Sequence, residues 1–480
     1  MRNKSMSNIR RAAGVAAVVF SGLLAAPAAN AAATITIVNG DPAGVGFNDP
    51  TATAPVGGNP GTTLGQQRLI AFQAVANKWG ATLTSSVTIR VLATFEPLTC
   101  TATGAVLGSA GAIQVFRDFP FAPIANTWYS KALANKLYGA ELDPSTADIR
   151  ARFNVNLGQP GCLTGVPFYL GLDNNHGPLV DLVAVLTHEF GHGLGFQTFT
   201  NGQTGTQLAA FPSAWDHFMR DTTQNLLWTE MTNAQRVASA INSRKLVWIG
   251  ANVTAAAPGV LSAGVPLVQI SGPAAGAATG TYDVGTASFG PLLGAPGLYG
   301  EVMPVTVNTV AGDACNPLSA VDVLAVSGKI ALLNRGVCGF TIKVKNAQNA
   351  GAIGVIVGDN APGGPPAGLG GTDVTITIPA VRITLADANT LRTALAKRSR
   401  TKSGVFANLT VNTAQLAGAD ASGFVQLYTP NPFQPGSSVS HYDTGAFRNL
   451  LMEPAINGDL THEVTTPYDL TFELFKDIGW

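Results

Sequence analysis

Two histidines and a glutamate near the middle of the chain have a spacing suited to metal chemistry. They lie in the segment HEFGH, which runs from His188 to His192. Helical positions four residues apart are one turn apart, so both imidazoles would project from the same face. Zinc prefers imidazole nitrogens in tetrahedral geometry, and this pair supplies half of such a set. Glu189 lies about 100° around the helix from His188, so it can hold a water molecule without ligating the metal.

This pattern predicts hydrolytic chemistry. Zinc lowers the pKa of a bound water to about 7, and the Glu189 carboxylate would take its proton as the water attacks a peptide carbonyl. Glu189 would later pass that proton to the leaving amine. The alternative is a pair of surface histidines beside a solvated glutamate. The apolar run 182–186 before the motif instead predicts a buried helix, where unpaired polar groups are costly. We therefore predict a catalytic zinc, with His188 and His192 as ligands and Glu189 as general base.

The residues around this motif carry a family resemblance. HEFGHGLGF, residues 188–196, resembles the metzincin clan of zinc proteases, whose longer motif is HExxHxxGxxH. Gly195 matches the glycine that turns the chain back to the metal, whereas Thr198 occupies the position of the third histidine. In this respect the sequence is similar to leishmanolysin, in which an inserted segment separates the motif from the third histidine.

The resemblance implies a third zinc ligand far along the chain. We favour His441, because Met452 follows it in a manner similar to the methionine turn of that clan. The final residues, LTFELFKDIGW, also resemble the end of leishmanolysin-like enzymes. The cost of closing the long intervening loop grows only logarithmically with its length. Tyr442, next to His441, is the one side chain considered for stabilising an oxyanion. The other candidates for third ligand are His217, Glu230 and His462, of which His462 is expected at the surface.

A second resemblance covers residues from about Leu261 to Gln426. This region is similar to the protease-associated (PA) domain that is inserted in many secreted peptidases. The resemblance implies a non-catalytic lid or docking surface, and it supports a Cys315–Cys338 bridge. The matching segments are DACNPL (313–318), GKIALL (328–333), RGVCGF (335–340), KVKNAQNAGA (343–352) and GVIVGDN (354–360).

The N-terminus and the cysteines predict export. Basic residues precede an apolar run, and Ala29–Ala31 has the small-x-small pattern of a cleavage site, so residues 1–31 are expected to be a secretory signal peptide. The apolar run is short of the roughly 20 residues that span a bilayer, and no membrane anchor is expected after cleavage. An even number of cysteines in an exported protein favours disulfides.

Four cysteines allow three pairings. We favour pairing within each half of the chain, Cys100 with Cys162 and Cys315 with Cys338. An alternative is that Cys100 is a thiolate that blocks the zinc ion in a latent form.

Hydrophobic periodicity predicts a mixed fold around the motif. The order of elements suggests an α+β domain with one mixed sheet. The predicted fold class is thus α+β, a metzincin-like zinc protease domain interrupted by a β-rich α/β PA domain. Strands are expected at 34–38, 86–95 and 149–157, and helices at 64–79 and from 181. The domains are expected at 32–255 (metallopeptidase, N-terminal part), 261–426 (PA) and 430–480 (metallopeptidase, C-terminal part).

Composition narrows the function further. Lys and Arg total 28, as do Asp and Glu, so no basic excess points to nucleic acid. A hydrophobic content of 46% excludes a disordered chain. Asp41, Asn48 and Asp49 offer oxygen ligands that calcium prefers, although loop capping is the favoured interpretation. We predict a secreted zinc metalloendopeptidase acting on proteins or peptides. The alternative is a non-catalytic secreted binding or adhesion protein that retains a protease fold.

Overall fold

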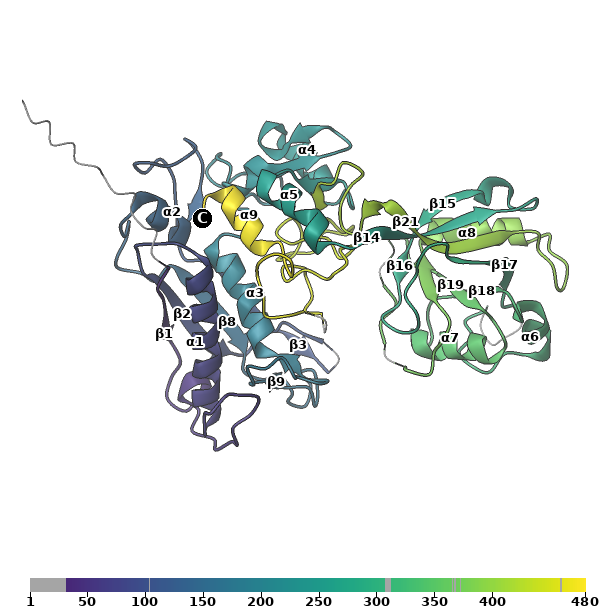
Figure 1. The fold of residues 1–480 in the computed structure, drawn as a ribbon, viewed down its shortest axis with the longest axis horizontal. Coiled ribbons are helices and arrows are strands. Elements are labelled where there is room, and N and C mark those ends of the chain that lie inside the picture. The colour runs from purple at the N-terminus through teal and green to yellow at the C-terminus, as the bar shows by residue number, and fades with distance from the viewer. Residues whose placement is uncertain are drawn as a thin grey trace, which may run out of the picture.

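The computed structural model describes residues 32–102, 104–306, 312–364, 366, 368–371, 373–457 and 460–480. The predicted signal peptide, residues 1–31, lies outside them. Two lobes are visible in Figure 1: the N-terminal half and the C-terminal end share one, and the segment between β14 (Ala263–Ser271) and β21 (Phe406–Leu416) forms the other. We call them the peptidase lobe and the PA lobe, after the domains that the sequence predicts in them. Within the described ranges, none of the helices has both the length and the apolar character needed to cross a membrane.

The peptidase lobe is built on a four-stranded mixed sheet. Its order is β1-β2-β8-β5, in which the first three strands are parallel and β5 is an antiparallel edge strand. Burial alternates along β2, because successive side chains of a strand point to opposite faces. The four strands are β1 (Ile35–Asn39), β2 (Ile89–Glu96), β5 (Gly108–Ala112) and β8 (Ile149–Asn154). The mixed sheet predicted from the sequence is therefore present.

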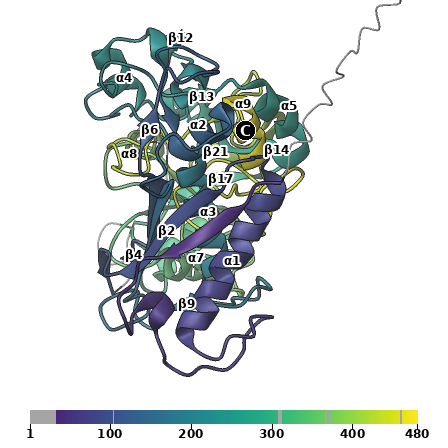
Figure 2. The ribbon, with the colours of Figure 1, turned by 90° about the vertical axis from the view of Figure 1, so that its left-hand side faces the viewer.

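Two helices, α1 (Leu64–Thr82) and α3 (Leu182–Leu194), lie side by side against this sheet (Figures 1 and 2). Each begins at a capping residue. The Thr63 side chain accepts a hydrogen bond from a backbone N–H in the first turn of α1, and Asp181 does the same for α3. Every residue of α3 is buried. Phe72 of α1 packs against the aromatic rings of Phe47, Phe95, Phe153 and Phe190.

A second sheet joins parts of the chain on either side of the PA lobe. Its order is β12-β11-β13-β22, and β22 comes from beyond the PA lobe in sequence. Its strands are β11 (Met219–Asp221), β12 (Leu226–Leu227), β13 (Leu246–Trp248) and β22 (Val425–Gln426). Helices α5 (Ala251–Val260) and α9 (Thr471–Ile478) pack together nearby. The pairing of β22 with β13 brings the segment after the PA lobe back to the N-terminal half.

The remaining elements of this lobe are short. They are η1 (Gly46–Asn48), β3 (Cys100–Thr101), β4 (Gly104–Ala105), β6 (Val115–Phe116), β7 (Tyr129–Ser130), α2 (Lys131–Tyr138), β9 (Phe168–Tyr169), β10 (Val180–Asp181), η2 (Trp215–Phe218), η3 (Trp228–Glu230) and α4 (Asn233–Ser239).

The PA lobe contains an eight-stranded sheet of order β15-β14-β21-β17-β18-β19-β20-β16. Strands β17 to β20 are parallel, and the others pair antiparallel. It has its own hydrophobic cores, separate from that of the peptidase lobe. Its other elements are η4 (Gly276–Ala278), β15 (Gly280–Asp283), β16 (Gly285–Thr286), β17 (Leu298–Pro304), α6 (Ala320–Val326), β18 (Ile330–Asn334), α7 (Phe340–Asn349), β19 (Gly354–Gly358), β20 (Ala380–Ile383) and α8 (Leu385–Leu395).

The two ends of the PA lobe lie next to each other. Strands β14 and β21 pair antiparallel along most of their length, and the Ala417 N–H donates to the Ser262 carbonyl at 3.0 Å. The chain therefore leaves and re-enters the peptidase lobe at one place, where β14 and β21 lie between the two lobes in Figure 1. The sheet lies inside the predicted range 261–426, while the domain limits themselves remain a prediction.

Both predicted disulfides are present. Cys100 is bonded to Cys162, and Cys315 to Cys338. The alternative of a free Cys100 thiolate is therefore wrong, because all four cysteines are paired. Disulfides form and persist in oxidising compartments, which indicates a location outside the cytoplasm.

Candidate metal centre

Three histidines from distant parts of the chain meet in the peptidase lobe. His188 and His192 project from α3, and His441 comes from the loop between β22 and α9. The Nε2 atom of His192 lies 3.1 Å from Nε2 of His188 and 3.1 Å from Nε2 of His441. All three side chains are buried. In the described part of the chain, this is the one group of three or more His, Cys, Asp or Glu side chains close enough to share a metal ion.

The hydrogen bonds of the three rings define their tautomers. Each Nδ1 atom lies 2.7–2.8 Å from a backbone carbonyl, and a carbonyl can only accept. Each Nδ1 therefore carries the proton, which leaves a lone pair on each Nε2. Burial lowers the pKa of His188 to about 4 and that of His192 to about 3, and it holds the pKa of His441 well below its usual value. All three rings are therefore neutral, with lone pairs facing one another.

Such an arrangement fits a bound zinc ion. Three lone pairs in contact cannot hydrogen-bond to one another, so they repel unless a cation lies among them. A Zn–N distance of 2.0–2.1 Å in tetrahedral geometry places ligand nitrogens about 3.3 Å apart, close to the 3.1 Å seen here. Histidine ligands characteristically donate their other N–H to a carbonyl or carboxylate. The donor set therefore has the chemistry, spacing and outer hydrogen bonds of a three-histidine zinc site.

The end of α3 explains how His192 is held. Gly195 follows the helix with φ of +131°, a conformation that side chains rarely adopt. The turn lets the Phe196 N–H donate to the Gly191 carbonyl at 3.0 Å. The Phe196 carbonyl is thereby brought back to accept the Nδ1–H of His192 at 2.8 Å.

His188 is held by a segment from the other end of the chain. Its Nδ1–H donates to the Leu451 carbonyl at 2.7 Å. The neighbouring Met452 is fully buried and packs against α3 at Gly191, where a Cβ atom would lie only 2.8 Å from the Met452 sulfur. The small residue in the motif thus permits close contact between the two segments.

His441 is fixed by its neighbours on both sides. Its Nδ1–H donates to the Ser437 carbonyl at 2.8 Å, and its own carbonyl accepts from the Tyr428 N–H at 2.9 Å. The preceding Ser440 hydroxyl oxygen accepts a hydrogen bond from the Thr198 N–H at 3.2 Å. The Tyr442 hydroxyl donates to the Leu470 carbonyl at 3.2 Å. The oxyanion role considered for Tyr442 is therefore wrong, because its fully buried hydroxyl serves this structural bond.

Thr198 and Asp216 were not foreseen as part of this support. The fully buried Asp216 accepts hydrogen bonds from the Thr198 hydroxyl at 2.5 Å and from the Thr200 hydroxyl at 2.6 Å. Thr198 occupies the position at which the longer motif has a histidine, and this departure from the motif could be seen in the sequence. Its link to Asp216 and Ser440 was not, because those contacts depend on the folded chain.

Glu189 is buried next to the histidines. Burial raises the pKa of Glu189 to about 8, and a hydrogen bond from the Ala110 backbone opposes this increase. Ala110 belongs to the edge strand β5. A cation among the three imidazoles would favour the charged carboxylate, because opposite charges attract at short range. A carboxylate in this position is suited to accept a proton from a water molecule.

The other candidates for third ligand have different partners. The Nε2 atom of His217 lies 3.0 Å from the Thr127 hydroxyl, and a Glu230 carboxylate oxygen accepts from the Leu227 N–H at 2.9 Å. His462, expected at the surface, is mostly buried and lies 2.7 Å from the carboxylate of Asp181, the cap of α3. None of these three side chains belongs to the histidine group.

The residues considered for calcium cap a loop instead. The two carboxylate oxygens of Asp41 accept from the N–H groups of Phe47 and Phe95. Asp49 pairs with Arg68 at 3.1 Å. These oxygens are committed to the protein, which agrees with the favoured interpretation of loop capping.

Comparisons with known proteins identify one part of the chain. The family model of the PA domain matches residues 299–391. A receptor homology region, transmembrane domain- and RING domain-containing protein of Oryza sativa subsp. japonica is 37% identical over 113 residues, which are 23% of this chain and 20% of that protein. A probable lipoprotein aminopeptidase of Mycobacterium tuberculosis is 35% identical over 94 residues, 19% of this chain and 18% of that protein. The chain spans about a fifth of the length of these curated relatives.

Solved structures of aminopeptidases also share a region with the chain. An aminopeptidase from Aneurinibacillus sp. strain AM-1 is 25% identical and covers 32% of this chain and 31% of its own, with a TM-score of 0.24. A zinc aminopeptidase from Bacillus subtilis is 23% identical over the same shares, with a TM-score of 0.22.

These findings correct the family predicted from the sequence. The matching family model is that of the PA domain, and the peptidase among the curated relatives is a probable aminopeptidase. The prediction of a metzincin related to leishmanolysin is therefore wrong, and the metzincin-like part of the predicted fold class is withdrawn with it. The PA prediction is confirmed, and the chain is a mixed α/β protein that contains a PA domain.

Proposed function

We propose that this chain is a zinc-dependent peptidase. His188, His192 and His441 would hold one zinc ion, and Glu189 would act as general base. The observation that carries the proposal is the group of three buried Nε2 lone pairs that face one another. The aminopeptidase names among the similar proteins support peptide-bond hydrolysis as the chemistry. The substrates would be proteins or peptides.

The chemistry divides between the ion and Glu189. When bound, zinc acts as a Lewis acid that polarises a carbonyl and makes a water molecule more acidic. The Glu189 carboxylate accepts the proton of the attacking water and later delivers it to the leaving amine nitrogen. Burial of the site excludes bulk water and strengthens these electrostatic interactions. The three carbonyl acceptors keep the imidazoles oriented throughout the reaction.

We favour cleavage within a chain over removal of single residues. Strand β5 stands at the end of the sheet order, and its Ala110 contributes a backbone hydrogen bond to Glu189. An extended peptide that paired with this edge would lie across the Glu189 carboxylate. It would then have residues on both sides of the cleaved bond. Two-metal sites are a recurring feature of aminopeptidases. The described residues offer a single three-ligand group without a bridging carboxylate.

Aminopeptidase activity is the second candidate, favoured by the names of the similar proteins. An internally quenched peptide with an acetylated N-terminus separates the two, because an aminopeptidase needs a free terminal amine. Cleavage of this peptide supports the endopeptidase. Hydrolysis of aminoacyl p-nitroanilides, without cleavage of the blocked peptide, supports the aminopeptidase.

Substitution Glu189→Gln tests the peptidase itself. Loss of the proton acceptor is expected to lower kcat/KM by about 10²–10⁴-fold, while zinc content measured by mass spectrometry stays near one per chain. Glu463→Gln is the matched control, because Glu463 is a surface residue paired with Lys78. A protein that binds zinc but hydrolyses no peptide, before or after the substitution, would instead be the non-catalytic binding protein.

A further inference from the structure

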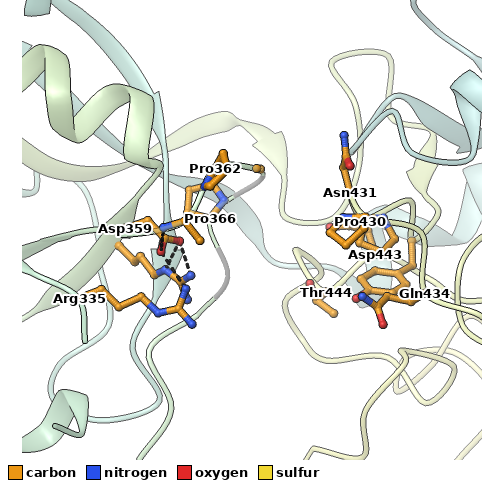
Figure 3. A pocket seen from close by; sticks show the side chains of 15 residues that line it. Arg335, Asp359, Pro362, Pro366, Pro430, Asn431, Gln434, Asp443 and Thr444 are labelled. Carbon is orange, nitrogen blue, oxygen red and sulfur yellow. Dashed lines mark hydrogen bonds and ion pairs between the residues drawn. The ribbon is translucent and has the colours of Figure 1, made fainter. Parts of the chain in front are cut away.

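A cavity of about 240 Å³ lies where the two lobes meet. One wall belongs to the PA lobe and carries Arg335, Asp359 and Arg382, and the other belongs to the peptidase lobe. Figure 3 shows Arg335 and Asp359 on one side, with Asn431, Gln434 and Thr444 across the opening. The Ser243 hydroxyl lies 2.7 Å from the Gly364 carbonyl and 3.0 Å from the Thr429 carbonyl, which ties the walls together.

The PA wall is placed at the carboxyl ends of parallel strands. Arg335 directly follows β18, Asp359 directly follows β19, and Arg382 is the penultimate residue of β20. Open α/β sheets characteristically bind ligands outside this edge. The position of the cavity in the fold therefore favours a binding site over an accidental gap.

The charged groups of this wall do not balance. Arg335 donates to one Asp359 oxygen at 2.8 Å, and Nε and Nη2 of Arg382 donate to the other. Burial would raise the pKa of Asp359, but the hydrogen bonds from Arg335 and Arg382 outweigh it and hold that pKa below its usual value. One carboxylate thus faces two guanidinium groups, which leaves an excess of one positive charge.

The facing wall does not cancel this excess. Asp443 lines the cavity, but it is itself paired with Arg244 at 3.5 Å. Three guanidinium nitrogens donate to Asp359, whereas two arginines together carry ten N–H donors. The Arg382 side chain is 9% exposed and that of Arg335 is 37% exposed. A buried cation and a more accessible one therefore stand together in one wall of the cavity.

We propose that this cavity binds a carboxylate group of a peptide, with Arg335 and Arg382 as its cationic partners. Planar guanidinium groups bind carboxylates through paired, charge-assisted hydrogen bonds. The amides of Asn431 and Gln434 on the facing wall suit a peptide backbone. The volume is below the usual range for drug-sized ligands and suits one acidic side chain or a C-terminal residue.

This site would anchor acidic peptide substrates near the zinc ligands, a role that rests on the proposed function. The facing wall includes Tyr428 and Thr444, which flank His441 in sequence. The Tyr428 N–H donates to the His441 carbonyl, so the wall and the third ligand belong to one hydrogen-bonded segment. Binding itself does not depend on catalysis, which allows the two proposals to fail separately.

The test measures binding to the full-length chain carrying Glu189→Gln, so that slow turnover does not interfere. Fluorescein-labelled heptapeptides of Gly, Ala and Ser are titrated by fluorescence anisotropy in three forms. One has a free C-terminal carboxylate, one has an amidated C-terminus and a single internal Glu, and one is amidated and uncharged. We expect at least one carboxylate form to bind at least about tenfold more tightly than the uncharged form, and the preferred form identifies the source of the carboxylate.

Substitutions in the same background locate the site. Arg335→Ala is expected to lower the affinity for the preferred peptide at least about tenfold. Arg335→Lys keeps the positive charge but loses the planar guanidinium group, so it is expected to lower the affinity less. Arg400→Ala removes one exposed PA-lobe cation away from the cavity and is expected to change nothing. Circular dichroism and zinc content verify that each variant is folded. Equal binding of all three peptides, no binding at all, or equal effects of Arg335→Ala and Arg400→Ala would overturn the proposal.

Discussion

Two clusters of polar side chains lie in different lobes, and they differ in how the cost of burying their polar groups is compensated. In the peptidase lobe, three imidazoles point identical lone pairs at one another. In the PA lobe, Asp359 lies between two arginines, and their opposite charges compensate for the cost of burying its carboxylate. The first cluster is unfavourable without a cation, whereas the second pairs its carboxylate with opposite charges from its own residues. Burial alone therefore does not identify a metal site, and the mutual compatibility of the buried groups does.

The largest expected effect comes from removing one member of the histidine cluster. Substitution His441→Ala should abolish stoichiometric zinc and lower kcat/KM by more than about 100-fold, because even outer-shell partners of a metal cost 10–100-fold. His217→Ala removes a half-buried histidine that lies 3.0 Å from the Thr127 hydroxyl instead and should retain zinc. Metal analysis and peptide hydrolysis measure both variants. Normal zinc content in His441→Ala would remove His441 from the ligand set.

Withdrawal of zinc is expected to change the stability of the two lobes to different extents. Zinc binds the folded peptidase lobe, so at 1,000 times its Kd it should add about 4 kcal/mol to the free energy of unfolding. Because the two lobes have separate cores, we expect two transitions in calorimetry. Chelation should lower the midpoint of the peptidase transition by several degrees and leave the PA transition in place. Equal shifts of both transitions would contradict the contrast between the lobes.

The three histidines differ in how they could be predicted from the sequence. His188 and His192 are one helical turn apart, so local spacing was sufficient to pair them, and the helix was expected from the apolar run before them. His441 was inferred only through the leishmanolysin resemblance, a family assignment that the comparisons contradict. The structure nevertheless places His441 with the other two histidines. The residue choice and the family name were therefore separate inferences: the family is contradicted, whereas the role of His441 as a zinc ligand stays a prediction.

Other features depended on contacts that sequence patterns do not encode. The acceptors for the three Nδ1–H groups are backbone carbonyls, which every residue type provides, so Leu451, Phe196 and Ser437 carried no signal. His462 was expected at the surface because nothing local indicated its pairing with Asp181 across the fold. The strands and helices of the peptidase lobe were easier to predict, because the alternation along β2 and the helical period of α1 arise from residues that are close in sequence.

Close contact between α3 and the sheet offers a third test. A Cβ atom at Gly193 would lie 2.3 Å from the Ile149 side chain, whereas at Gly191 it would meet the flexible Met452 side chain at 2.8 Å. We expect Gly193→Ala to lower the free energy of unfolding of the peptidase lobe by about 1–3 kcal/mol through overpacking. Gly191→Ala should cost less, because Met452 can move and alanine favours the helix by up to about 1 kcal/mol. Urea titration of both variants measures the difference, and equal losses would contradict this account.

The smallest effect concerns the PA cluster and pH. The folded-state pKa of Asp359 lies below its usual value, so its carboxylate contributes stability at pH values above the usual aspartate pKa of about 4. That contribution is lost as the pH falls through the lower, folded-state value. The PA transition should therefore move to lower temperature under acid conditions, and Asp359→Asn should reduce this dependence. Asp283→Asn, at an exposed position of the same lobe, is the charge-matched control and should preserve it. If both variants kept the same pH dependence, the arginines would not be holding Asp359 in its charged form. The contrast with the neutral histidine cluster would then lose its electrostatic basis.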